Sequence, residues 1–139
     1  YDSKSAFTLS INHRDTYTGI TDSDRCLTTK RFAELSSELI SKKDRESIAA
    51  SKLGSEFRTP GHIPVCLEQK GGLKTREGHT ELAVAVSRLA NEPPVVIGAE
   101  MLQPEGSAAL SVEDAKKWAS ERGILFLTGD EIKKKIQGD

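Results

Sequence analysis

The residues best suited to chemistry lie in one short segment at the end of a glycine-containing loop, Arg76-Glu77-Gly78-His79-Thr80-Glu81. An apolar repeat over residues 82–89 follows it and predicts a helix. A helix N-terminus has unpaired backbone N–H groups and a partial positive charge, and an arginine can clasp two phosphate oxygens. Thr80 is a suitable N-cap, and His79 can bind a metal or a proton. The segment therefore predicts a phosphate site, and the alternative is an ordinary capped helix with a solvent-facing His79.

Two further stretches carry groups of the same chemical kind. His62 ends the segment Arg58-Thr59-Pro60-Gly61-His62 and lies seventeen residues before His79. Glu100 ends the strand-like run Val95-Val96-Ile97-Gly98-Ala99 and lies twenty-one residues after His79. In open α/β sheets, ligands gather at the C-terminal ends of strands. Two histidines and one carboxylate also form a donor set for zinc, so a zinc hydrolase is one alternative.

These segments, together with Thr18-Gly19-Ile20-Thr21-Asp22-Ser23-Asp24-Arg25, resemble the 3,4-dihydroxy-2-butanone 4-phosphate synthase family of riboflavin biosynthesis. The four motifs stand in the family's order and spacing, and the resemblance runs from about Ser5 onward. The residues of the Thr18–Arg25 motif are similar to those of archaeal members. The resemblance implies conversion of D-ribulose 5-phosphate to L-3,4-dihydroxy-2-butanone 4-phosphate and formate. It further implies Mg²⁺, or Mn²⁺, as cofactor and a cytoplasmic homodimer that does not act on nucleic acid or membranes.

The resemblance also implies a role for individual residues. His62 and Glu100 match the proton-transferring pair, and His79 matches the metal ligand. Substrate binding falls to Thr18, Arg76, Glu77, Gly78, His79, Thr80 and Glu100. The family's other metal ligand comes from an N-terminal acidic loop of the form D-x-x-x-E-x-E-x-D, which this sequence does not contain. We therefore expect residues 1–139 to be the C-terminal two-thirds of one synthase domain. The chain is then a fragment, one piece of a nicked chain, or part of a protein whose missing segment is supplied separately. A non-catalytic phosphate-binding or assembly fragment is the remaining alternative.

Composition limits the class of protein. A chain of 139 residues is enough for one domain, and 36% hydrophobic with 29% charged residues is typical of a soluble globular protein. The net charge of −1 provides no field that would attract nucleic acid. The sequence has no apolar run of about 18 residues and no signal-peptide pattern. It opens on Tyr1 without an initiator Met, which indicates the middle of a protein. Cys26 and Cys66 are expected to be two free thiols.

The hydrophobic pattern predicts alternating strands and helices. A charged, solvated connection is expected over residues 40–55, and a turn at Pro60-Gly61. We expect strands over residues 7–11, 63–68, 95–101 and 124–127, and helices over residues 27–39, from Thr80 to Pro93, and after the N-caps Ser111 and Thr128. The predicted fold class is α/β in the mixed α+β sense, a single-domain layered fold with a mixed, partly parallel sheet and flanking helices.

Overall fold

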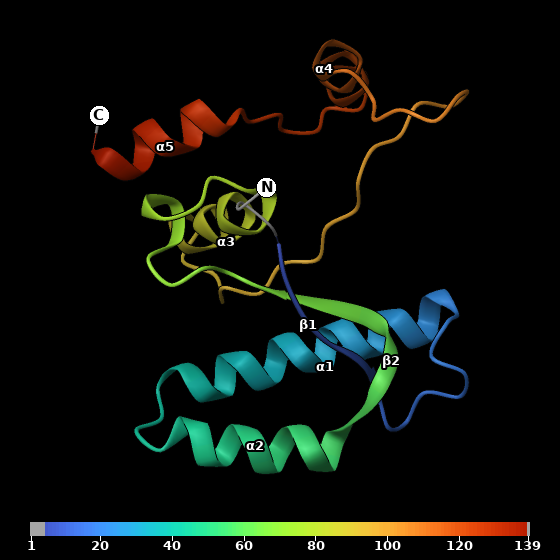
Figure 1. Cartoon of the computed structure of the whole chain (residues 1–139), viewed down its shortest axis with the longest axis vertical. Helices are drawn as coiled ribbons and strands as arrows, with labels where there is room; N and C mark the ends of the chain where they lie inside the picture. The colour runs from blue at the N-terminus through green and yellow to red at the C-terminus, as the bar shows by residue number, and fades with distance from the viewer. Residues whose placement is uncertain (1–4, 139) are drawn as a thin grey trace. The chain divides into compact units, whose positions relative to one another are not determined.

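The computed structural model describes residues 5–138 and divides the chain into two compact units, Tyr1–Val96 and Ile97–Asp139. The first unit holds the strands β1 (Ala6–His13) and β2 (Phe57–Leu67), which pair antiparallel. The helices α1 (Asp22–Ile40) and α2 (Arg45–Glu56) lie between the strands in sequence and pack against them (Figure 1). A short 3₁₀ helix, η1 (Gly72–Lys74), then precedes α3 (His79–Leu89).

The core of the first unit sits where the two strands meet α1 and α2. Ile11, Leu35 and Phe57 are its buried centre. The ring of Phe32 meets the ring of Phe57 edge-on at 5.8 Å, a favourable aromatic arrangement. Other partly buried apolar side chains pack around this centre: Leu39, Leu53, Ile63 and Val65. The predicted strand over residues 7–11 is confirmed, but its burial is confined to its C-terminal end, since Phe7 and Leu9 are exposed.

The expected connection over residues 40–55 is wrong, because most of it is the helix α2. Its composition hides the helix: charged and small residues dominate, and Leu53 is the side chain that packs on the core. Ion pairs across the two helices add to this contact. Glu56 accepts a hydrogen bond from Arg31 at 2.9 Å, and Lys52 lies 3.6 Å from Glu38. Tertiary contacts therefore form a helix that the weak apolar repeat did not predict.

The expected turn at Pro60-Gly61 is also wrong, because both residues lie within β2. The strand is irregular there: Ile11 pairs with Ile63, whereas the next residue, Asn12, pairs with Arg58. The segment Thr59–His62 thus has no counterpart on β1 and forms a large bulge. Bulges re-aim side chains at functional sites, and this one carries His62.

The second unit contains α4 (Val112–Glu121) and α5 (Gly129–Gln137). Both predicted N-caps are confirmed. The Ser111 hydroxyl accepts from the Asp114 amide at 3.1 Å, and Thr128 forms a capping box with Glu131. An antiparallel bridge joins Leu102 and Ala109.

The mixed helix-and-strand class is confirmed, but the parallel part of the sheet is not found. Residues 95–101 and 124–127 form no strand, and the sheet within residues 5–138 consists of the antiparallel β1–β2 pair. A strand needs a neighbouring strand for its backbone N–H and C=O groups, and within the described residues neither segment pairs with one. The two cysteines are free, as predicted. No helix within residues 5–138 is long and apolar enough to cross a membrane.

Candidate functional site

The predicted phosphate segment forms the N-terminus of α3, with the N-cap two positions earlier than expected. Gly78 is the N-cap and His79 the first helical residue, so the expectation that Thr80 caps the helix is wrong. The first turn closes on the Gly78 carbonyl, which accepts from the Leu82 amide at 3.0 Å. A glycine has no side chain to satisfy the first-turn N–H groups, and this helix has no side-chain cap at its N-cap position. His79 is exposed.

A buried ion pair supports this helix start. The Glu81 side chain is fully buried, and its carboxylate accepts from the Gln69 amide at 3.0 Å and from Arg76 at 2.5 Å. Burial raises the pKa of the Glu81 carboxyl, but hydrogen bonds from the Gln69 amide, its own amide and Arg76 outweigh it, so this pKa lies below its ordinary value. Arg76 also donates to the Ser5 hydroxyl at 3.3 Å. Arg76, which the sequence predicted to bind phosphate, is therefore hydrogen-bonded to the Glu81 carboxylate of its own chain.

Gly78 leaves the space that the Arg76 guanidinium occupies. A Cβ at position 78 would lie 1.9 Å from Nη1 and 2.5 Å from Nη2 of Arg76. The backbone of Gly78 has φ −99°, which any residue can adopt. The glycine is thus needed for the close approach of the arginine and not for its backbone conformation.

We expect Gly78→Ala to displace Arg76 from Glu81 and to lower the free energy of unfolding by about 1–3 kcal/mol, as overpacking does. Urea denaturation measures this loss. Gly98→Ala is the matched control, because nothing lies within 4 Å of a Cβ at that position. Equal free energies of unfolding for the two variants would show that the Arg76 side chain moves aside without loss of stability.

The Thr18–Arg25 segment forms a tight loop around one carboxylate. Asp24 accepts from the Gly19 amide at 2.7 Å and the Thr18 amide at 3.0 Å, and from the Thr18 hydroxyl at 3.3 Å. These bonds, led by the one from Gly19, lower the pKa of Asp24. Arg25 donates to the Ile20 carbonyl at 3.0 Å, and Thr21 caps α1. Asp24 and Arg25 therefore brace the loop, while substrate binding by Thr18 stays a prediction.

His62 is exposed on the bulge of β2, and its contacts run to β1. The His62 amide donates to Oδ1 of Asn12 at 2.8 Å, and Nδ1 of the His62 ring lies 3.0 Å from Nδ2 of Asn12. Asn12 is buried, with 3% of its surface exposed. Sequence reasoning missed Asn12 because it is fifty residues from His62 and has no recognisable motif.

Glu100 lies in the second unit, exposed and outside regular secondary structure, so the expected strand end is not found there. Its partnership with His62 and His79 stays a prediction. Within residues 5–138, no group of three or more His, Cys, Asp and Glu side chains is placed to hold a metal ion. His79 is a single nitrogen donor, and Mg²⁺ prefers several oxygen ligands, so the described residues do not make a magnesium site by themselves.

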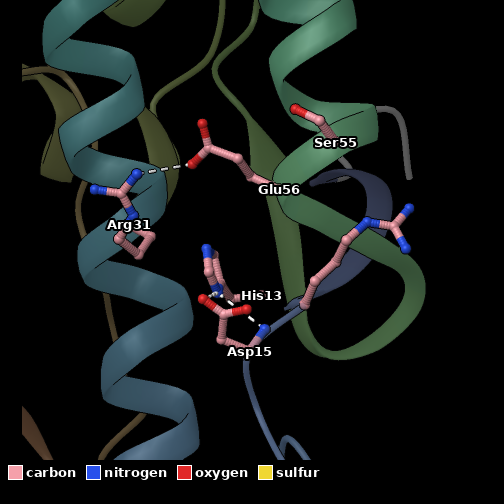
Figure 2. Close-up of a pocket in the computed structure, with 6 residues that line it drawn as sticks. His13, Asp15, Arg31, Ser55 and Glu56 are labelled. Carbon is pink, nitrogen blue, oxygen red and sulfur yellow. Dashed lines mark hydrogen bonds and ion pairs between the residues drawn. The ribbon is translucent and has the colours of Figure 1, made fainter.

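A pocket of about 320 Å³ lies at the C-terminal end of β1, and none of the predicted site residues lines it. Figure 2 shows Glu56 bonded to Arg31 across it, with Asp15 beside His13. The hydrogen bond from Arg31 lowers the pKa of Glu56, and the one to Glu56 raises the pKa of Arg31. Because these charges neutralise one another, the pocket is best explained as a structural ion-pair site.

Comparison with known proteins places this geometry in a family. The model of the 3,4-dihydroxy-2-butanone 4-phosphate synthase family matches residues 1–135. The synthase of that name from Methanosarcina mazei is 42% identical over 132 residues, which are 95% of this chain and 51% of that protein. The one from Archaeoglobus fulgidus is also 42% identical, over 95% of this chain and 53% of its own. The chain thus spans about half the length of the curated relatives it matches.

Solved structures agree with the sequences. A crystal structure of the synthase from Candida albicans is 28% identical, with a TM-score of 0.77 over 95% of this chain and 60% of that one. A second synthase structure, in complex with two magnesium ions, is 24% identical with a TM-score of 0.67 over 99% of this chain and 62% of that one, a likeness of fold alone. With the family model matched over residues 1–135, which include all four motifs, the chain belongs to the 3,4-dihydroxy-2-butanone 4-phosphate synthase family.

Proposed function

We propose that the intact protein, meaning this chain with any further residues encoded with it, converts D-ribulose 5-phosphate to L-3,4-dihydroxy-2-butanone 4-phosphate and formate. The observation that carries the proposal is the family match over residues 1–135, which takes in the segments of Thr18, His62, His79 and Glu100. The archaeal relatives, named for the synthase, support the riboflavin pathway as its setting. A cytoplasmic location belongs to the same proposal.

In this proposal the exposed start of α3 binds the substrate phosphate. The helix N-terminus supplies partial positive charge, Arg76 supplies guanidinium N–H donors near Gly78, and Thr80 supplies a hydroxyl. Because Arg76 is anchored to Glu81 at 2.5 Å, its guanidinium is pre-oriented before substrate arrives. Holding a charged group in place reduces the ordering cost of binding. Thr18, Glu77 and Gly78 complete the substrate contacts.

The same proposal assigns proton transfer to His62 and Glu100 and metal binding to His79. A divalent metal, Mg²⁺ or Mn²⁺, would polarise carbonyl and enediolate oxygens of the sugar. His79 would be one ligand, and the oxygen ligands that such an ion prefers would come from outside the described residues. An acidic segment like the family's N-terminal loop is the proposed source of those oxygens.

The decisive assay is formate release from ribulose 5-phosphate by the intact protein with added Mg²⁺. We expect turnover that stops with a chelator and returns when Mg²⁺ is restored. A non-catalytic phosphate-binding fragment would bind the substrate in calorimetry without releasing formate. The family match does not favour that alternative, nor the zinc hydrolase. Metal analysis tests the latter, because zinc would co-purify tightly and Mg²⁺ would not.

We expect the intact protein to be a homodimer, as the family resemblance implies. Light scattering at micromolar concentration should give twice the chain mass. The 139-residue chain measured beside it is the control, because loss of a contributing segment would by itself favour the monomer. A monomeric intact protein would contradict the expectation.

A further inference from the structure

The side chain of Asn12 holds His62 at two points, and this determines which ring nitrogen carries the proton. The backbone N–H of His62 can only donate, so the Asn12 atom that faces it at 2.8 Å is the carbonyl oxygen Oδ1. The other end of the amide, Nδ2, is a donor without acceptor capacity. Since Nδ2 lies 3.0 Å from Nδ1 of His62, Nδ1 must accept. The proton of the neutral ring is then on Nε2.

The surroundings keep the Asn12 amide from turning over. Rotating it by a half-turn would bring Nδ2 against the His62 N–H and Oδ1 against the lone pair of Nδ1, losing both hydrogen bonds. Asn12 is buried, so water does not replace them. Two motif glycines pack close to it. A Cβ on Gly19 would lie 2.1 Å from Nδ2 of Asn12, and one on Gly61 would lie 2.4 Å from the Asn12 backbone nitrogen.

The close approach of Gly61 also sets the position of the bulge. The Gly61 amide donates to the Ser10 hydroxyl at 3.1 Å. Ser10 lies two residues before Asn12, on the same face of β1. A side chain at position 61 would meet the Ile11 carbonyl carbon at 2.0 Å. The Thr18–Arg25 loop and the Arg58–His62 segment, far apart in sequence, therefore converge on one residue of β1 that belongs to neither motif.

We propose that Asn12 is a positioning residue that holds His62 as the neutral Nε2–H tautomer, so that His62 offers substrate a hydrogen-bond donor and not a base. A neutral imidazole with a fixed donor can stabilise a negative oxygen of an enediolate. The inference rests on the proposed function for the identity of that oxygen. Within the proposed proton-transferring pair, it narrows the role of His62 to that of a hydrogen-bond donor and leaves Glu100 as the base.

Two-bond ¹H–¹⁵N spectra of the intact protein near neutral pH test the tautomer directly. We expect the wild-type His62 ring to be protonated on Nε2 and bare on Nδ1. Asn12→Asp should move the proton to Nδ1, because a carboxylate accepts and cannot donate. Ser10→Ala is the matched control: it removes a hydrogen bond from the same bulge without touching the His62 ring, and it should leave the wild-type tautomer.

The kinetic readout follows from the same change. Asn12→Asp should lower kcat for formate release by about 10²-fold, the loss typical of removing one such donor, with KM little changed, while Ser10→Ala stays near wild type. Equal losses in both variants, or a wild-type ring protonated on Nδ1 and bare on Nε2, would overturn the inference. If Asn12→Asp does not fold, the wild-type spectrum decides alone. A wild type with the Nε2–H ring but no formate release would overturn the proposed function and leave the tautomer assignment standing.

Discussion

Replacing Glu100 by Gln is expected to reduce formate release by the intact protein at least ~10²-fold, the lower end for a general acid–base group. The amide keeps the shape of the carboxylate and one of its two acceptor oxygens but cannot take a proton. Glu100 is exposed, so the change removes no buried contact within its unit. Substrate binding and the melting temperature should therefore barely change. A coupled formate assay and calorimetry measure the two effects separately.

Glu105→Gln is the matched control for Glu100. Glu105 is an exposed carboxylate in the same unit, also outside regular secondary structure, and its variant should keep full turnover. Wild-type formate release from Glu100→Gln would remove Glu100 from the mechanism. A large fall in melting temperature would instead make it a structural residue.

Replacing Arg76 by Met should have the largest effect on stability, because it strands a fully buried carboxylate. The Glu81 side chain has no exposed surface, and Arg76 has 13%. Removing one partner of such a pair typically costs about 3–5 kcal/mol, since the remaining charge stays buried and uncompensated. We expect the free energy of unfolding to fall by this amount in urea denaturation near neutral pH, where the Glu81 carboxyl with its lowered pKa is ionised.

The Arg88–Glu68 pair is the matched control for Arg76. It has the same side chains and two hydrogen bonds of 2.5 and 2.6 Å, but Arg88 is 54% exposed. Arg88→Met should cost only ~0–1 kcal/mol, as exposed pairs do. Arg76→Lys keeps the charge next to Glu81 while losing the planar fork, so it should weaken ribulose 5-phosphate binding more than stability. Unchanged binding by calorimetry would remove Arg76 from the phosphate site.

Local signals in the sequence predicted the features that depend on neighbouring residues. The N-caps Ser111 and Thr128 were predictable because a cap joins a side chain to an amide three residues on. The strand at the start of the chain followed from alternation. Family membership was predicted from the order and spacing of four motifs, and the family match confirms it.

Tertiary structure decided what depends on distant partners. The helix α2 is stabilised because Leu53 packs on the core and Glu56 pairs with Arg31 of α1. The sequence of the segment itself does not indicate these contacts. Residues 95–101 are apolar enough for a strand but belong to no sheet within the described residues. The burial of Glu81 depends on Gln69 and Arg76, and the proton position on His62 depends on Asn12, fifty residues away. Spacing showed which residues could do chemistry, whereas only packing shows which atom each one presents, because hydrogen bonds across the fold set charge and tautomer.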